Sequence, residues 1–368
     1  MTFLELFTEF TLFNHSCTMK INLSSDLKRF KSIKIFKWLS VSILALATAL
    51  NISQNILFPQ SSYAQQQLVG RPDVQIFIDE LVKRHRLDRK SLEDQFAELR
   101  TDPAVLRLIQ PVPPSARSWR VYRGNHVDAF RITEGRKFMI KHSKILSAAE
   151  EATGVPVEII TSILGIETNY GGNKGGFKVL RSLATLTFAF PDRADEFRPQ
   201  LVDLFLLARE QNQPAGVFLG SYAGAMGYPQ FLPSSWLSYG KDGDGDGRID
   251  LINSVDDAIF SVGNYLKQHG WTSGGPVAVP VAVEMKQALN LRAAGDRPRL
   301  SQQQLLDAGV KVRTGSMAKE LAVLVDLPTP GEKTDYWLGY PNFYSIMQYN
   351  RSFFYAMAVY QLAMSLAK

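Results

Sequence analysis

Apolar residues recur at intervals of three and four along much of this chain after about residue 70, which is the spacing of one buried helix face. Residues 73–108 follow that spacing, with a helix break expected at Pro103, and residues 130–153 follow it again. The pattern therefore predicts helices over much of this half of the chain. Three apolar positions of the second stretch are candidates for the core: Ile140, Ile145 and Leu146.

A nearly continuous apolar run lies between Pro156 and Glu167. Pro156 stands where the first turn of a helix tolerates a proline, so we expect a buried helix to begin there. Residues 180–208 predict two more helices divided near Pro191, and residues 257–269 predict another.

The pattern changes after Trp271. Residues 277–283 are rich in valine, a β-branched residue that favours strands, and Pro280 stands in the middle of them. Because proline cannot donate a backbone hydrogen bond to a neighbouring strand, we expect an edge strand or an extended segment. Two further short strands are predicted at residues 309–312 and 322–325, and a brief helix at residues 301–308. A final helix, rich in aromatic residues, is predicted at residues 342–366.

These elements predict an α+β fold that is mainly α, with a small β-containing insertion before the last helix. We expect an export segment, an N-terminal helical region, a helical catalytic core, the insertion and a C-terminal helix that returns to the core. Their expected bounds are residues 1–64, 65–139, 140–273, 274–340 and 341–368.

Residues 1–64 have the order of a secretory signal: a basic run, an uncharged apolar stretch at residues 38–52, and small residues ending at Ala64. The apolar stretch is short for a membrane span, although an uncleaved anchor is the alternative. Met19 is a possible true start. Cys17, the only cysteine, precedes the apolar stretch, so the exported part would have no thiol or disulfide.

The net charge of +6 falls once this segment is removed, because it contains six of the 41 Lys and Arg residues and three of the 35 Asp and Glu residues. The mild basic excess that remains is far from the dense basic surface of a nucleic-acid-binding protein. It would modestly favour an anionic polymer such as a cell wall.

Glu167 is a lone carboxylate at the end of the apolar helix, before Gly171 and Gly172, which we expect to end that helix. Apolar surroundings and the negative end of the helix dipole both disfavour ionisation and should raise the pKa of Glu167. A raised pKa suits a general acid near neutral pH. The alternative is a helix-end glutamate that points to water.

Residues 220–236 combine small residues with aromatic ones. Small residues let backbone approach a ligand closely, aromatic rings offer flat apolar faces, and Ser221 and Gln230 offer hydrogen bonds. This mixture suits a sugar, although a glycine-rich turn between helices is the alternative. The aromatic residues of the segment are Tyr222, Tyr228, Phe231 and Trp236.

Both segments resemble the membrane-bound lytic murein transglycosylase B family. The resemblance lies in residues 167–171 at the helix end and in residues 220–235, and it continues in residues 341–346, 349–350 and 355–358. It extends from about residue 73 to the C-terminus. Three long motifs in the same order argue against a chance match.

The resemblance implies a lysozyme-like fold with one catalytic carboxylate, which falls on Glu167. In that family the acid protonates the glycosidic oxygen between N-acetylmuramic acid and N-acetylglucosamine, and the resulting base helps the muramoyl 6-hydroxyl attack the anomeric carbon. The product carries a 1,6-anhydro end. The family's glycan-binding positions fall on Ser221, Gln230, Tyr265, Tyr349, Asn350, Tyr355 and Tyr122, and the second of two family arginines falls on Arg193.

Asp192 stands at the first of those two arginine positions, so we do not expect a two-arginine clamp. An ordinary glycoside hydrolase uses two carboxylates, and the motifs offer none besides Glu167, which favours an internal nucleophile. The alternatives are a muramidase that hydrolyses the same bond and a catalytically idle peptidoglycan-binding protein. The intact Glu167 argues against the idle protein.

Residues 242–250 follow the pattern of an EF-hand calcium loop, with acids at alternate positions, a glycine at the sixth and a backbone carbonyl at the seventh. Asn253 replaces the usual glutamate at the twelfth position. The resemblance suggests a longer loop closed by Asp256, and Asp257 could substitute. The predicted ligands of this structural calcium ion are Asp242, Asp244, Asp246, Arg248 through its carbonyl, and Asp256. The alternatives are an acidic solvated turn without an ion and a loop that binds sodium or magnesium, although flexible loops with many oxygen ligands favour calcium.

We expect a monomeric enzyme of the periplasm or cell envelope, without an organic cofactor. Its partners would be peptidoglycan strands and, as a further possibility, proteins of cell-wall synthesis. Nucleic acid is not expected, and membrane contact would occur only through an uncleaved export segment.

Overall fold

The structure is a computed structural model that describes residues 65–110 and 117–368. The predicted export segment, with Cys17 and Met19, lies outside the described residues. Within those ranges the structure contains no helix with the length and apolar content needed to cross a membrane.

The first described elements are helices, as the spacing of apolar residues predicts. A new helix begins at Pro103, the expected break, and His142 interrupts the stretch predicted at residues 130–153. The helices are α2 (Pro72–His85), α3 (Arg89–Ala97), α4 (Pro103–Leu108), α5 (Trp119–His126), α6 (Ala129–Lys141) and α7 (Ser143–Thr153).

Ile140 is 77% exposed, so its prediction as a core residue is wrong. Helix α6 buries Phe138, and a residue two positions further along a helix points about 200° away. Leu146, by contrast, is buried on α7. Because the helix is interrupted at His142, the buried face of α6 does not continue into α7.

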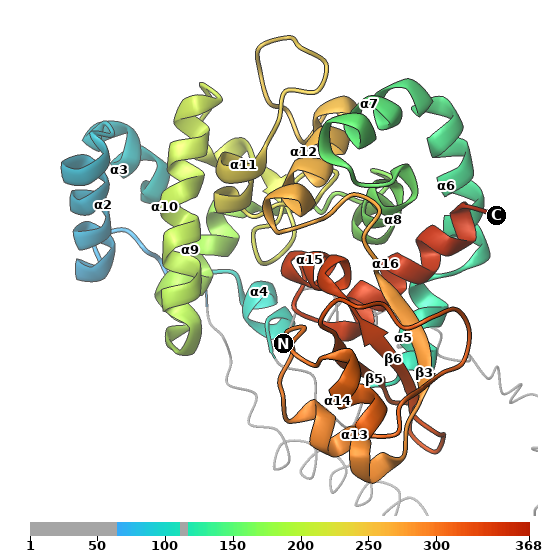
Figure 1. The fold of residues 1–368 in the computed structure, drawn as a ribbon. Coiled ribbons are helices and arrows are strands. Elements are labelled where there is room, and N and C mark those ends of the chain that lie inside the picture. Colours follow the sequence, from blue (N-terminus) through green and yellow to red (C-terminus); the bar gives the residue numbers. More distant parts are fainter. Residues whose placement is uncertain (1–64, 111–116) are drawn as a thin grey trace, which may run out of the picture. The chain divides into compact units, whose positions relative to one another are not determined.

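Helix α8 (Val157–Thr168) is buried along almost all of its length. Helices α6, α7, α12 and α16 pack against it from four parts of the chain (Figure 1). The helices and short strands of this part are α9 (Val179–Ala189), η2 (Pro191–Arg193), α10 (Ala194–Glu210), η3 (Ala215–Val217), α11 (Pro233–Tyr239), α12 (Val255–Gln268), α15 (Pro341–Tyr349), α16 (Phe353–Leu366), β1 (Phe177–Lys178) and β2 (Leu219–Gly220).

A four-stranded antiparallel sheet with the order β4-β3-β6-β5 lies in the predicted insertion (Figure 1). Residues of one face, such as Leu324 and Leu338, form a separate cluster with Leu291 and Leu305, whereas residues of the other face, such as Val323 and Val325, join the main hydrophobic core. The elements are β3 (Ala278–Ala282), α13 (Met285–Arg292), α14 (Gln302–Asp307), β4 (Lys311–Val312), β5 (Val323–Leu327) and β6 (Asp335–Gly339).

Strand β3 pairs on both sides, so its prediction as an edge strand is wrong. Pro280 is tolerated because its carbonyl accepts the backbone N–H of Arg313 at 2.9 Å on the β4 side. In an antiparallel strand the amide and carbonyl of one residue point the same way, so the missing N–H faces that side too. Strand β4 is only two residues long and ends there.

Candidate active site

Glu167 lies in the last turn of α8, where the chain leaves the helix abruptly. The helix ends not at the glycines but at Asn169, whose φ of 51° is left-handed, and Tyr170 follows with a φ of 60°. The amides of Asn169 and Tyr170 donate to carbonyls of the preceding turn. An αL conformation is uncommon for a bulky residue, so the packing around Tyr170 must stabilise it.

Two glycines make room for the Tyr170 ring. A Cβ atom on Gly165 would lie 2.5 Å from the Tyr170 hydroxyl oxygen, and one on Gly135 would lie 2.4 Å from it. That hydroxyl donates to the carbonyl of Arg131 at 2.7 Å. Tyr170 therefore anchors the end of α8 to α6, just beyond Glu167.

The Glu167 carboxylate accepts a hydrogen bond from the Tyr355 hydroxyl, with 2.7 Å between Oε1 and the phenol oxygen. Burial raises the pKa of Glu167 to about 8, and the hydrogen bond from Tyr355 partly opposes that rise. Burial also raises the pKa of Tyr355 well above its usual range. Tyr355 therefore remains a donor throughout the range in which Glu167 titrates.

Two more tyrosines, Tyr349 and Tyr265, pack beside Tyr355, and we call these three residues the tyrosine wall. The Tyr349 and Tyr355 rings stack with centroids 6.1 Å apart, and the centroid of Tyr265 lies 4.8 Å from that of Tyr349. The Tyr349 hydroxyl donates to the Pro229 carbonyl at 2.5 Å, and the Tyr265 hydroxyl donates to the Gln348 carbonyl at 2.6 Å. The structure thus brings together three predicted glycan-binding tyrosines from α12, α15 and α16.

Ser221 is buried within a tight turn of the glycine-rich segment. Its hydroxyl oxygen accepts the amides of Ala223 at 3.3 Å and Ala225 at 3.1 Å. Gly220 precedes it in β2 and pairs with Phe177 of β1. In this structure Ser221 shapes the loop.

Gln230 holds the same loop from its other end. It adopts a left-handed φ of 49°, and its amide nitrogen donates to the carbonyls of Gly227 at 2.9 Å and Lys174 at 3.2 Å. Lys174 in turn donates to the Ile252 carbonyl at 2.7 Å, and its ammonium lies 4.5 Å from the Tyr228 ring centroid. The loop is therefore fixed by neighbours on both sides.

Gly227 permits the close approach between this loop and the acidic segment. Its φ is +71°, and a Cβ atom would lie 2.2 Å from the backbone oxygen of Leu251. We expect Gly227→Ala to lower the free energy of unfolding by about 2 to 4 kcal/mol, because backbone must move and the conformation is strained. Urea unfolding followed by circular dichroism would measure the loss.

Gly124→Ala is the matched control for Gly227→Ala. Gly124 lies in α5, its φ is not left-handed, and an added Cβ would meet no atom within 4 Å. This control should leave stability unchanged or raise it by about 1 kcal/mol. Equal stability of both variants would show that the contact with Leu251 does not constrain the loop.

The remaining predicted glycan-binding residues, Asn350, Tyr122 and Arg193, differ in burial and in their partners. Asn350 follows α15, is 7% exposed, and its Oδ1 atom has no hydrogen-bond partner among the described residues. Tyr122 on α5 is buried and stacks on His126 with 4.2 Å between ring centroids. Arg193 pairs with Glu196 at 2.6 Å and lies over Phe197, so its guanidinium group is already engaged.

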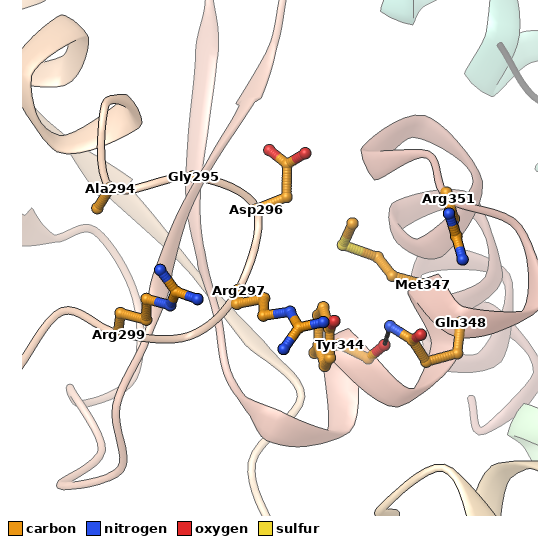
Figure 2. Close-up of a pocket in the computed structure, with 9 residues that line it drawn as sticks. All are labelled: Ala294, Gly295, Asp296, Arg297, Arg299, Tyr344, Met347, Gln348 and Arg351. Atoms are coloured by element: carbon orange, nitrogen blue, oxygen red, sulfur yellow. Dashed lines mark hydrogen bonds between the residues drawn. The ribbon is translucent and has the colours of Figure 1, made fainter.

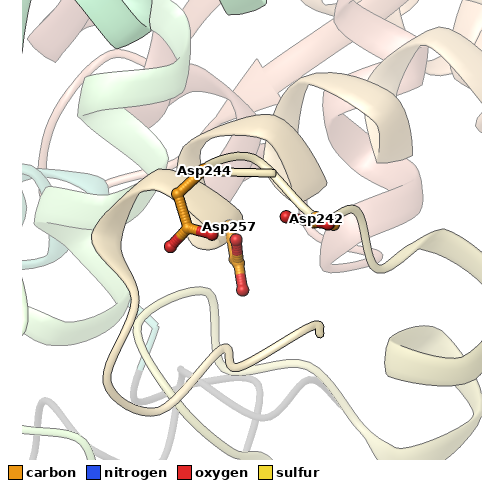
Figure 3. Close-up of side chains that lie close together, drawn as sticks. All are labelled: Asp242, Asp244 and Asp257. Atoms are coloured by element: carbon orange, nitrogen blue, oxygen red, sulfur yellow. The ribbon is translucent and has the colours of Figure 1, made fainter. Parts of the chain in front are cut away.

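The acidic segment forms an exposed loop before α12. Asp242 accepts the amides of Gly245 and Gly247, and Asp246 accepts the amide of Arg248. Each of three carboxylates, those of Asp242, Asp244 and Asp257, offers an oxygen within 4.8 Å of the other two (Figure 3). Ca²⁺ binds oxygen at about 2.3 to 2.6 Å, so opposite ligands lie up to about 5 Å apart. The three oxygens therefore fit one such ion.

The structure places Asp257, not the predicted Asp256, with Asp242 and Asp244. Ser254 caps the N-terminus of α12, and the turn of that helix directs the Asp257 carboxylate inward. There it accepts the amides of Gly243 at 2.8 Å and Asp250 at 2.6 Å. The Asp246 carboxylate is not part of this group, and Arg248, predicted to bind through its backbone carbonyl, lies two residues further along the loop.

The acidic loop is followed directly by Leu251 and Ile252, which hold the glycine-rich loop of the site. The amide of Tyr228 donates to the Leu251 carbonyl at 2.9 Å, next to the bond between Lys174 and Ile252. Residues that follow the acids thus hold the loop that carries Gln230.

Thr168 and Lys174 are supports that the sequence analysis missed. The Thr168 hydroxyl lies 3.0 Å from the Tyr228 carbonyl and accepts the amide of Gly171 at 2.9 Å, which ties the end of α8 to the glycine-rich loop. Thr168 lies within the Glu167 motif and Lys174 lies three residues after it, and that proximity is the signal that could have identified them.

A model of the transglycosylase SLT domain family matches residues 70–364. Membrane-bound lytic murein transglycosylase B of Escherichia coli (strain K12) is 36% identical over 323 residues, 85% of this chain and 88% of that protein. The crystal structure of soluble lytic transglycosylase SltB1 from Pseudomonas aeruginosa is 39% identical, with a TM-score of 0.75, and covers 80% of this chain and 98% of that one. Escherichia coli lytic transglycosylase Slt35, solved in complex with calcium, is 36% identical with a TM-score of 0.73, and covers 84% of this chain and 98% of that one.

The two solved structures are matched over nearly their whole length and share the fold of this chain. The lysozyme-like fold that the sequence predicts is thereby confirmed. The chain belongs to the transglycosylase SLT domain family and is a lytic transglycosylase.

Proposed function

We propose that this enzyme cleaves the β-1,4 bond between N-acetylmuramic acid and N-acetylglucosamine in peptidoglycan and leaves a 1,6-anhydro-muramoyl end, with Glu167 as the single acid and base. The observation that carries the proposal is the part-buried Glu167 carboxyl group, with a pKa of about 8 and one hydrogen-bond donor, Tyr355. A carboxyl group with that pKa is largely protonated at neutral pH and can act as an acid.

The reaction balances with this one residue. The Glu167 carboxyl group gives its proton to the glycosidic oxygen, and the bond between that oxygen and the muramoyl anomeric carbon breaks with its electron pair on the oxygen. The Glu167 carboxylate then takes the proton of the muramoyl 6-hydroxyl as that oxygen bonds to the anomeric carbon. No water is consumed, and Glu167 returns to its protonated state.

The surroundings of Glu167 favour this route over hydrolysis. Among the described residues, its pKa is shifted by burial and by Tyr355, and no second carboxylate contributes its charge. Hydrolytic glycosidases place two carboxyl groups within about 10 Å of each other for the acid and for water or the nucleophile. An internal nucleophile makes the second group unnecessary.

The sugar rings would bind beside the tyrosine wall of Tyr265, Tyr349 and Tyr355, of which Tyr349 is partly exposed, with Tyr122 further along. Aromatic faces pack against the apolar faces of sugars. The buried Oδ1 atom of Asn350 has no partner among the described residues, so it would accept a hydrogen bond from the substrate. Ser221, Gln230 and the engaged Arg193 would act mainly through the shape of the groove.

Product analysis tests this proposal directly. Purified peptidoglycan would be digested and the soluble fragments weighed by mass spectrometry. We expect muropeptides that are one water molecule lighter than their reducing counterparts. Fragments with reducing muramic acid would instead show hydrolysis, and absence of soluble fragments would end the enzymatic assignment.

The acidic loop would bind a structural Ca²⁺ ion through Asp242, Asp244 and Asp257. Their oxygens fit the spacing of one ion, and the similar Slt35 structure was solved in complex with calcium. When bound, the ion would neutralise the repulsion among the acids and stabilise the loop ahead of Leu251 and Ile252. Those residues support the glycine-rich loop of the site.

Removal of calcium should lower the melting temperature by several degrees, because a ligand that binds only the folded state stabilises it by about 3 kcal/mol at a hundredfold excess over its Kd. Differential scanning calorimetry in EDTA and in CaCl₂ would measure the shift. Asp242→Asn/Asp257→Asn should melt at the same temperature in both. A wild-type protein indifferent to EDTA would contradict the site, and rescue by Mg²⁺ alone would contradict the choice of ion.

The enzyme would act in the cell envelope, where its substrate lies. A relative named for membrane-bound murein cleavage supports this location. The export signal predicted in residues 1–64 lies outside the described residues and remains a prediction, as do a monomeric state and partners from cell-wall synthesis.

A further inference from the structure

A cavity of about 390 Å³ opens between the segment that follows α13 and the end of α15. Three arginines line it, Arg297 and Arg299 from the insertion and Arg351 from the residues after α15, together with Tyr344 and Gln348 (Figure 2). We call it the basic pocket. Pockets that bind small-molecule ligands usually have volumes of roughly 300 to 1,000 Å³.

Among the described residues, none of the three arginines forms an ion pair with a carboxylate, although the charge of Arg351 contributes to lowering the pKa of Glu196. The nearby Asp296 is paired instead with Arg292 at 3.0 Å, and Arg292 also holds Asp326 at 2.7 Å. With Arg292 included, four arginines stand against these two carboxylates, so the pocket keeps a positive charge. The guanidinium carbon of Arg297 lies 5.8 Å from the Tyr344 ring centroid, and Figure 2 shows it directed toward that ring.

The basic pocket adjoins the tyrosine wall. Gln348 lines the pocket, and its backbone carbonyl accepts the hydroxyl of Tyr265. Arg351 follows Asn350 directly in sequence.

We propose that the basic pocket binds the free carboxylates of the peptide stem carried by a muramoyl residue in the groove. This inference rests on the proposed function, because it requires peptidoglycan as the substrate. Where a stem is attached, the lactyl carboxyl group of the muramoyl residue is in amide linkage, so the sugar part offers only hydroxyl and acetamido groups and needs no cationic pocket. Arginine guanidinium groups match carboxylates in charge and in planar, two-pronged geometry, and the stem is where such carboxylates occur.

The test compares glycan strands of equal length with and without peptide stems, cut by the full-length enzyme and by Arg297→Gln/Arg299→Gln. Both arginines are exposed, so their replacement should not affect folding. On stem-bearing strands kcat/KM should fall about 10- to 100-fold, mainly through KM, as lost hydrogen bonds to charged groups predict. On stem-free strands the variant should match the wild-type enzyme.

A control variant removes the same charge elsewhere. Lys83→Gln/Arg84→Gln changes two exposed residues in the last turn of α2, and it should behave as wild type on both substrates. Stem-free strands carry free lactyl carboxylates on their muramoyl residues, so they also distinguish the stem from the lactyl group as the occupant.

The outcomes separate this inference from the proposed function. An equal loss on both substrates, or no loss on either, would overturn the basic pocket as a stem site. A wild-type enzyme without preference for stem-bearing strands would overturn it as well. If the wild-type enzyme released no anhydro-muropeptides from either substrate, the proposed function would fall first.

Discussion

Glu167→Gln should release anhydro-muropeptides from purified peptidoglycan at least about 10³-fold more slowly than the wild-type enzyme, since general acid and base catalysis contributes 10²- to 10⁴-fold. Glutamine keeps the size of the side chain and can still accept the hydrogen bond from Tyr355. It has no acidic proton to give and cannot take one from the muramoyl 6-hydroxyl. Both halves of the reaction therefore lose their proton carrier, and product mass spectrometry against time would measure the loss.

The variant should remain folded, which circular dichroism and its melting temperature would establish. Its matched control is Glu158→Gln, the same substitution in the first turn of the same helix, away from Tyr355. Glu158→Gln should keep near-normal turnover. Turnover of Glu167→Gln close to that of the control would mean that another group is the acid.

The position of Glu167 could be predicted because its signals are local. An apolar helix that ends in a carboxylate is visible in consecutive residues, and the structure confirms the helix. Its partner Tyr355 lies 188 residues later, on a helix whose apolar pattern says only that it is buried. Periodicity alone does not show which buried helices meet, and it was the family resemblance that brought Tyr355 into the site.

The structure departs from prediction where one position along a helix or strand decides the outcome. Asp256 and Asp257 are equivalent in composition, and only the turn of α12 after its cap at Ser254 selects Asp257. Ile140 satisfies an apolar pattern that ignores the break at His142. These outcomes depend on helix phase, which capping and breaks set.

The insertion was harder to predict because its strands are short and its pairing is non-local. Strand β6 was not predicted, although Tyr336 and Trp337 have high β propensity. It pairs with β3, more than 50 residues earlier, and that pairing makes β3 an inner strand despite Pro280. Local propensity cannot determine how many partners a strand has, so the sequence led to an edge strand.

Tyr355→Phe should reduce kcat/KM by about 10- to 100-fold, because a hydrogen bond to a charged group contributes about 1.5 to 3 kcal/mol. The Tyr355 hydroxyl stabilises the Glu167 carboxylate that forms as the proton leaves, so its loss disfavours that transition state. The same bond lowers the pKa of Glu167 against the larger effect of burial. Its removal should therefore move this pKa further upward from about 8.

The pH dependence distinguishes this role from a merely structural one. Since the acid must be protonated, the alkaline limb of kcat/KM should fall near pH 8 in the wild-type enzyme and at higher pH in Tyr355→Phe. Tyr349→Phe is the control: it removes the hydroxyl of a neighbouring tyrosine that bonds to the Pro229 carbonyl instead of Glu167, so its alkaline limb should stay near that of the wild-type enzyme. An alkaline limb that moved downward in Tyr355→Phe, or equally in both variants, would show that Tyr355 does not set the acidity of Glu167.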